Sequence, residues 1–262
     1  LFMTDWYIDQ MKSKSYESNP LPISFNHNEY VGDKLDYTAH IPKVESRWEI
    51  KDFIDFIKNP KSTVELQNGQ TIHFFPTNKI RIPVDKNTII NNKVVASKYN
   101  DSIVSYIDID IKGNALYKNR LMMLDIIANN NWKRPIYFSP GAFEDEDYLW
   151  MKNYLQLEGM VYKLVPIKTK VEKDTNPMDM GGLDADKMYS IVMKWDWGNS
   201  RGDIYHDPET RKNSISYRSV LSRLMDKLIV EGKLDKAKKV IELSLTEMPV
   251  EKFGYYSMVE PF

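Results

Sequence analysis

A Gly-x-Ser-x-Gly pattern at Gly198–Gly202 is the first feature of this sequence that could carry out chemistry. In hydrolases with this pattern, the serine sits on a sharp turn between a strand and a helix. Here the preceding segment has helical spacing, and the following segment is extended and ends at Pro208. Asp203 and His206 also follow Ser200 too closely to supply separate acid and base loops. We therefore interpret this stretch as a turn between two helices and assign no catalytic residue.

An Asp-x-Asp pattern at Asp108 and Asp110 could hold a divalent metal and a sugar nucleotide. Hard divalent cations prefer carboxylate oxygens, and one class of glycosyltransferase uses this spacing. The pattern recurs at Asp145–Asp147 and Asp184–Asp186, which shows how readily it arises. Strand alternation also accounts for Asp108 and Asp110 as a solvated face. The alternative hypothesis is that the chain is a soluble, metal-dependent sugar-nucleotide glycosyltransferase in which Asp108 and Asp110 bind the metal.

Composition narrows the remaining chemistry. The chain has no cysteine, which excludes disulfides and thiolate nucleophiles, and its four histidines lack metal-ligand spacing. It also has no glycine-rich phosphate loop. The 36 Lys and Arg residues and 37 Asp and Glu residues are interspersed, so no basic field exists to neutralise nucleic-acid phosphates. We expect no cofactor, no metal and no nucleic-acid partner.

Aromatic residues at the ends of elements are the remaining candidates for binding. An exposed indole ring could stack on a sugar or a partner, although a core plug with its N–H bonded to a loop carbonyl is the preferred interpretation. Ligands of parallel sheets also bind beyond the carboxyl ends of strands, which directs attention to the segment after residue 138. The candidate binding residues are Trp132, Arg134, Ser139, Gly141, Trp195, Trp197 and Asn199.

The elements that must position these residues alternate between strand and helix. Ser46–Glu49 has the form of a capping box and precedes a helix with a single apolar face up to Ile57. Asn68–Gly69 between two apolar segments predicts a hairpin. Alternation over Ile103–Ile111 predicts a half-buried strand. Residues 85–102 are polar and rich in Asn, and we expect a long excursion there.

A helix is expected to open at Gly113–Asn114, and a βαβ unit to follow it. The βαβ unit comprises a strand at Pro135–Ser139, a helix at Glu144–Glu158 with Gly159 just after its end, and a strand at Met160–Pro166. We therefore predict an α/β fold with a partly parallel sheet, a βαβ unit and a hairpin insertion, followed by a helical tetratricopeptide-like C-terminal region.

The predicted organisation has three parts. Residues 1–168 form the α/β domain with the hairpin insertion at about 62–84, residues 169–183 a linker, and residues 184–262 the helical region. Within 216–247, apolar spacings around Gly232 match one tetratricopeptide repeat, and a lone repeat must pack on another element. Apolar stretches are too short to span a bilayer. Both ends look truncated, so we expect a fragment.

Several segments together resemble a known family. These segments are TDWYIDQMKSKSY, LPISF, LMMLDIIANNNWKRPIYFS, YLQLEGMVYKLVP, DADKMYSIVMKWDWGN and EGKLDKAKKVIE. They resemble the C-terminal soluble region of bacterial multi-spanning membrane proteins of unknown function, which are similar to the transmembrane protein O-mannosyltransferases. The resemblance covers the whole chain, and Asn131–Phe138 is its most specific stretch.

The resemblance implies a parent glycosyltransferase whose membrane-embedded N-terminal half does the chemistry. This chain would then be a non-catalytic extracytoplasmic domain on the periplasmic face of the bacterial inner membrane. Its partners would be that membrane-embedded half and an acceptor or assembly-partner protein. Because the membrane half is absent from this sequence, no catalytic residue of the family can be carried over.

Overall fold

The structure is a computed structural model that describes residues 1–13, 18–139, 147–169 and 180–254. The chain divides into two compact units. Unit 1 comprises Leu1–Ile136, Asp147–Met151 and Val165–Lys168, and unit 2 comprises Tyr137–Glu146, Lys152–Leu164 and Thr169–Phe262.

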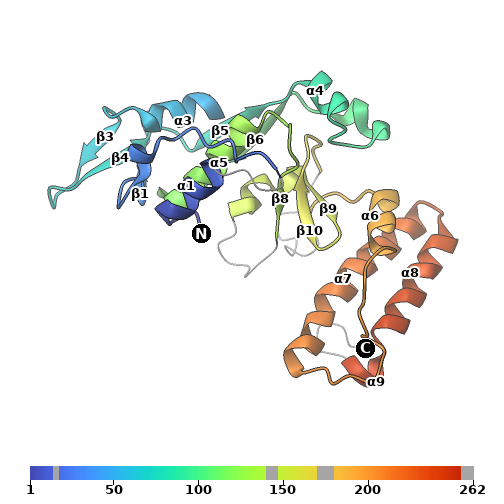
Figure 1. The fold of residues 1–262 in the computed structure, drawn as a ribbon. Helices are drawn as coiled ribbons and strands as arrows, with labels where there is room; N and C mark the ends of the chain where they lie inside the picture. Colours follow the sequence, from blue (N-terminus) through green and yellow to red (C-terminus); the bar gives the residue numbers. More distant parts are fainter. Residues whose placement is uncertain (14–17, 140–146, 170–179, 255–262) are drawn as a thin grey trace. The chain divides into compact units, whose positions relative to one another are not determined.

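The first sheet of unit 1 is partly parallel and has the strand order β3-β4-β1-β7. Figure 1 labels β3, β4 and β1 of this sheet. Its strands are β1 (Tyr37–His40), β3 (Thr63–Glu65), β4 (Thr71–Phe75) and β7 (Ala115–Tyr117). Strands β1 and β4 are parallel, with Ala39 opposite Phe74, and the other pairs are antiparallel. The predicted hairpin is confirmed, because Gly69 has the positive φ of 79° that lets β3 turn into β4.

The second sheet of unit 1 has the order β2-β5-β6. Its strands are β2 (Trp48–Glu49), β5 (Lys79–Pro83) and β6 (Tyr106–Asp110). Strand β2 is parallel to β5, whereas β5 and β6 are antiparallel. The predicted alternation of β6 is confirmed, with Ile107 and Ile109 buried and Asp108 and Asp110 exposed.

Helices α3 (Ile50–Lys58) and α5 (Lys118–Asn130) pack against each other in unit 1. The apolar face predicted for α3 is buried, and Phe53 meets Phe75 of β4 edge to face at 5.5 Å. The predicted capping box is wrong, because the chain is still extended in β2 and Glu49 is the N-cap of α3. The helix expected to open at Gly113–Asn114 is also displaced, because strand β7 comes first.

The remaining helical elements of unit 1 are short. They are α1 (Asp5–Ser13), α2 (His27–Tyr30), α4 (Lys86–Asn91) and η1 (Ser97–Ser102), a 3-10 helix. The long excursion predicted for residues 85–102 therefore contains two short helical elements, α4 and η1. Asp85 caps α4, because its carboxylate accepts a hydrogen bond from Thr88 N at 3.0 Å. The Asp-x-x-Thr pattern in the sequence is typical of a helix N-terminus and could have predicted α4.

Unit 2 contains a small antiparallel sheet of order β8-β10-β9. Its strands are β8 (Tyr137–Phe138), β9 (Leu155–Glu158) and β10 (Val161–Leu164), and η2 (Asp147–Tyr154) precedes β9. The βαβ unit predicted within residues 135–166 is wrong. Gly159, with φ of 66°, lies in the hairpin turn between β9 and β10 and not after a helix. The sequence pattern could not separate the two positions, because a glycine with positive φ suits both.

The described part of unit 2 also contains helices α6 (Ala185–Val192), α7 (Pro208–Val230), α8 (Leu234–Glu247) and α9 (Val250–Phe253). Helices α7 and α8 lie side by side (Figure 1), joined through Gly232 with φ of 71°. Leu221, Leu224 and Leu228 of α7 are fully buried, whereas Ile241 of α8 is 40% exposed.

The predicted fold class is confirmed as a mixed α/β chain with partly parallel sheets and a C-terminal helical region. The division into units differs from the predicted domains, because the β9–β10 hairpin groups with the helices. Arg223 of α7 explains this grouping, since it donates hydrogen bonds to the carbonyl of Met180 and to the hydroxyl of Tyr162 in β10. Most of the predicted linker lies outside the described residues. Among the helices of the described ranges, none has the length and apolar character to span a membrane.

Candidate functional site

Unit 2 contains a pocket of about 630 Å³. It is lined by Met160 in the β9–β10 turn, by the segment that links α6 to α7, by the first half of α7, and by Met248 and Phe253. This volume is in the range of small-molecule and anchor-residue pockets. The pocket is therefore the candidate binding site of unit 2.

Local turns fix the segment from α6 to α7. After α6 ends, the backbone N–H of Trp195 donates to Val192 O at 3.1 Å. The carboxylate of Asp196 accepts from Gly198 N at 2.8 Å, and Gly198 has a φ of 56° that a side chain would resist. These contacts hold both tryptophans of the WDWGN stretch against the pocket.

An aromatic cluster of Trp195, Trp197 and Tyr217 forms one wall. The ring centroids lie 5.6 Å apart for the two tryptophans and 5.7 and 5.8 Å from each of them to Tyr217. Trp195 meets both other rings edge to face, and such packing stabilises the rings beyond the area they bury. The indole Nε1 of Trp197 is shielded from solvent and finds no hydrogen-bond partner in the part of the chain that the structure describes.

Helix α7 supplies a second wall through residues three and four apart. Thr210, Asn213, Ser214 and Tyr217 line the pocket and share one face of the helix. Asp207 fixes where the helix begins, because its carboxylate accepts from the backbone N–H groups of the first turn.

The environment of Ser200 is not that of a hydrolase nucleophile. Its hydroxyl donates to Glu247 Oε2 at 3.1 Å. The Nε2 atom of His206 lies 2.8 Å from the carbonyl oxygen of Ser200, not from its hydroxyl. Arg201 approaches the other oxygen of Glu247 at 3.7 Å, and Lys252 donates to Gly202 O. These contacts tie the Gly-x-Ser-x-Gly turn to the end of α8 and to α9.

Three of the seven predicted binding residues, Trp195, Trp197 and Asn199, meet in the pocket. Trp132 and Arg134 belong to unit 1, where the guanidinium of Arg134 donates to Asn19 O at 2.9 Å and thereby holds that loop.

Of the two candidates after β8, Ser139 is exposed and Gly141 lies outside the described residues. Ser139 was predicted because ligands of parallel sheets bind beyond the carboxyl ends of strands. That argument does not apply, because β8 is antiparallel to its neighbour β10.

Sequence reasoning missed Tyr217 and Met160. No apolar pattern marks Tyr217, because Thr210, Asn213 and Ser214, which share its helix face, are all polar. Met160 was predicted at the start of a strand, and only the pairing of β9 with β10 places it in a hairpin turn.

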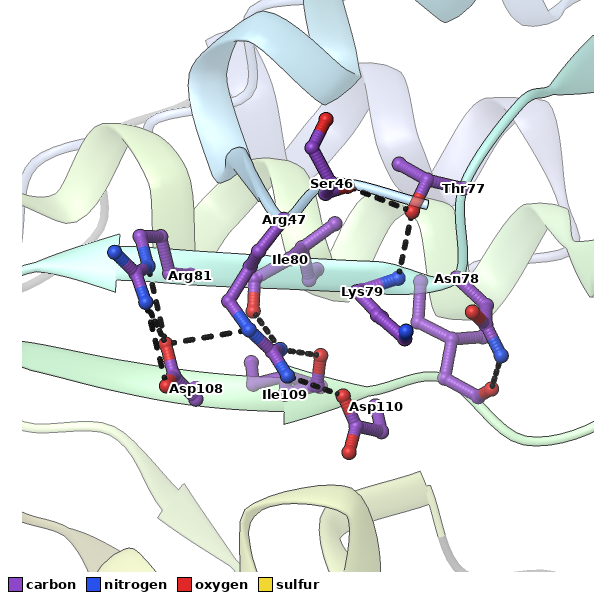
Figure 2. A network of polar contacts seen from close by, with 11 residues as sticks. Ser46, Arg47, Thr77, Asn78, Lys79, Ile80, Arg81, Asp108, Ile109 and Asp110 are labelled. Carbon is purple, nitrogen blue, oxygen red and sulfur yellow. Dashed lines mark hydrogen bonds and ion pairs between the residues drawn. The ribbon is translucent and has the colours of Figure 1, made fainter. Parts of the chain in front are cut away.

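The carboxylates of Asp108 and Asp110 are engaged with arginines (Figure 2). Arg47 lies 2.7 Å from Asp110 Oδ1 and 3.6 Å from Asp108 Oδ1, and Arg81 donates to Asp108 at 3.1 Å. Arg47 also donates to Ile80 O and Ile109 O, at 2.9 and 2.8 Å, so it joins β5 to β6. Asp108 and Asp110 therefore form ion pairs that stabilise the second sheet, and a metal would have to displace two guanidinium groups. In the ranges that the structure describes, no group of three or more His, Cys, Asp or Glu is placed to hold a metal.

This network gives a testable prediction. Replacing Arg47 with methionine is expected to lower the free energy of unfolding by about 2 kcal/mol, because two carbonyls and a carboxylate lose their donor. Chemical denaturation measures this change.

Isothermal titration of the unmodified chain with MnCl₂ is expected to give no saturable heat. Saturable binding that disappears in Asp108→Asn would instead support the metal-site alternative.

The described architecture is that of a mixed α/β domain followed by a helical region that carries a pocket. The family model for TMEM260-associated domain 2 matches residues 1–187, more than half of the chain. The chain therefore belongs to the TMEM260-associated domain 2 family. The match ends within α6, so most of the pocket lies beyond the matched residues. Comparisons with curated proteins and with solved structures give no match.

Proposed function

We propose that this chain is a non-catalytic extracytoplasmic domain of a glycosyltransferase-like membrane protein, and that it binds an acceptor or partner protein. The family match and the resemblance to protein O-mannosyltransferases support the membrane-protein context. In this proposal the parent protein's membrane-embedded half carries the reaction, on the periplasmic side of the inner membrane.

The pocket of unit 2 carries the binding part of the proposal. It combines an aromatic wall with several polar side chains, as binding sites do, and it is built from well-anchored turns. The described side chains with catalytic patterns are engaged elsewhere: Ser200 with Glu247, and Asp108 with Arg47 and Arg81. Binding therefore explains the arrangement better than catalysis.

Site-specific photo-crosslinking tests this proposal. Tyr205 is 83% exposed and follows Ile204, which lines the pocket. A photoreactive residue at position 205 is expected to capture a discrete polypeptide from envelope extracts of the source organism. The captured protein, once purified, is expected to bind the unmodified chain in calorimetry.

The matched control places the same residue at Leu66, a 38% exposed position of unit 1. Similar crosslinks from both positions, or no crosslink from position 205, would contradict the proposal.

A further inference from the structure

The chemistry of the pocket restricts what it can bind. Resting on the proposed function, we infer that it takes a neutral polypeptide segment that inserts one aromatic or large aliphatic side chain. About half of its lining is apolar: Met160, Trp195, Trp197, Ile204, Tyr217, Met248 and Phe253. Two methionines give this lining the adaptability that peptide-binding surfaces use.

The charge of the lining favours a neutral ligand. Among the described residues, no Lys or Arg lines the pocket, and the one carboxylate in the lining, that of Asp196, already accepts a hydrogen bond from Gly198 N. Glu247, next to Ser200, is paired with Arg201. A charged anchor would lose its hydration and find no free partner of opposite sign among these residues, which is costly.

The free polar groups match a peptide backbone. The side-chain amides of Asn199 and Asn213 make no hydrogen bond among the described residues, and each offers donors and an acceptor. Thr210 and Ser214 are already committed, to Asp207 and to Arg211 O. Peptide N–H and C=O groups can satisfy both amides, whereas an acyl chain would leave them unpaired.

The rim of the pocket has the composition of a protein interface. Ile204 and Tyr217, which line the pocket, are 46% and 38% exposed, and Tyr205, next to Ile204 in the chain, is 83% exposed. Tyrosine and tryptophan dominate the energetic centre of protein interfaces. Asn199 and Asn213 could also hydrogen-bond the hydroxyls of a sugar, but Ile204, Phe253 and the two methionines give apolar contacts that suit an anchoring side chain.

A random peptide library displayed on phage, selected on the immobilised full chain, tests the inference. Enriched peptides are expected to share one Trp, Phe, Leu or Met flanked by uncharged residues. The best peptide is then synthesised with capped ends, and its Kd is measured by fluorescence anisotropy.

Tyr217→Ala is expected to weaken binding of this peptide by about tenfold or more, because the aromatic wall of the pocket loses one of its three rings. Asn213→Ala, on an exposed helix position that keeps the fold, is expected to weaken it by about fivefold. Tyr37→Ala, at a similarly exposed tyrosine of unit 1, is expected to change the Kd by less than about twofold.

Three outcomes would overturn the inference: no enriched peptide, enriched peptides with charged anchors, or peptide binding that is indifferent to Tyr217 and Asn213. Binding of methyl α-hexosides that depends on Tyr217, without peptide binding, would also overturn it in favour of a sugar site. If crosslinking from position 205 succeeds while the library fails, the proposed function stands and only this inference falls.

Discussion

Replacing Lys118 with alanine is expected to destabilise unit 1 by about 3 kcal/mol, the lower end of the range for breaking a buried ion pair. The side chain of Lys118 is fully buried at the start of α5. Its Nζ lies 3.2 Å from Asp5 Oδ1 and 2.7 Å from Asp36 Oδ1, and it donates to Gly32 O at 2.7 Å. It thereby joins α1 and the segment before β1 to α5.

The size of this effect depends on how well the two carboxylates can rehydrate. The side chains of Asp5 and Asp36 are 29% and 44% exposed, so part of their charge returns to water when Lys118 is removed. Chemical denaturation followed by circular dichroism measures the change. Lys112→Ala, at an exposed position nearby, is the control and is expected to cost less than about 0.5 kcal/mol. Equal costs for the two variants would show that the buried ammonium does not organise unit 1.

Replacing Asp125 with alanine is expected to cost about 3 kcal/mol, because it leaves two donors of Ser24 without their acceptor. Asp125 is fully buried in α5. Its carboxylate accepts from Ser24 N and Ser24 Oγ, both at 2.6 Å, and from Asn129 Nδ2 at 2.9 Å. Thermal and chemical unfolding measure the loss. Asp55→Ala, at an exposed position of α3, is the matched control. A loss no greater than that of the control would refute the anchoring role of Asp125.

The same carboxyl makes stability depend on pH. Burial raises the pKa of Asp125 above its usual range, although the hydrogen bonds from Ser24 oppose this. A raised pKa means that the folded state binds the proton more tightly than the unfolded state. The contribution of Asp125 is therefore fully present below the unfolded-state pKa and is lost as the pH rises through the raised value. Relative to Asp125→Asn, the wild type is expected to lose stability as the pH rises from acidic to neutral. A difference that is flat or grows with pH would contradict this sign.

Part of the candidate site could be predicted from the sequence because it lies within one short segment. Trp195, Trp197 and Asn199 fall within a turn that the sequence already marks with Gly198, and they meet in the pocket. The interpretation of Ser200 as a turn residue agrees with its contact to Glu247. Tyr217 and Met160 come from elements whose approach no local pattern encodes.

The sequence by itself determined the elements whose signal is local. The apolar periodicity of α3, the alternation of β6 and the Asn68–Gly69 hairpin are set by neighbours within one or two turns of chain, so their patterns identify them. The membership of the chain in an α/β class follows from the order of such elements.

Only the tertiary structure decided how strands pair and what the polar side chains do. Gly159 satisfies a helix end and a hairpin turn equally well, and it was the pairing of β9 with β10 that made it a turn. Asp108 and Asp110 become partners of Arg47 only because β2, β5 and β6 lie together. The physical reason is the same in both cases: a contact between residues distant in sequence depends on the free energy of the whole packing, which a local pattern does not contain.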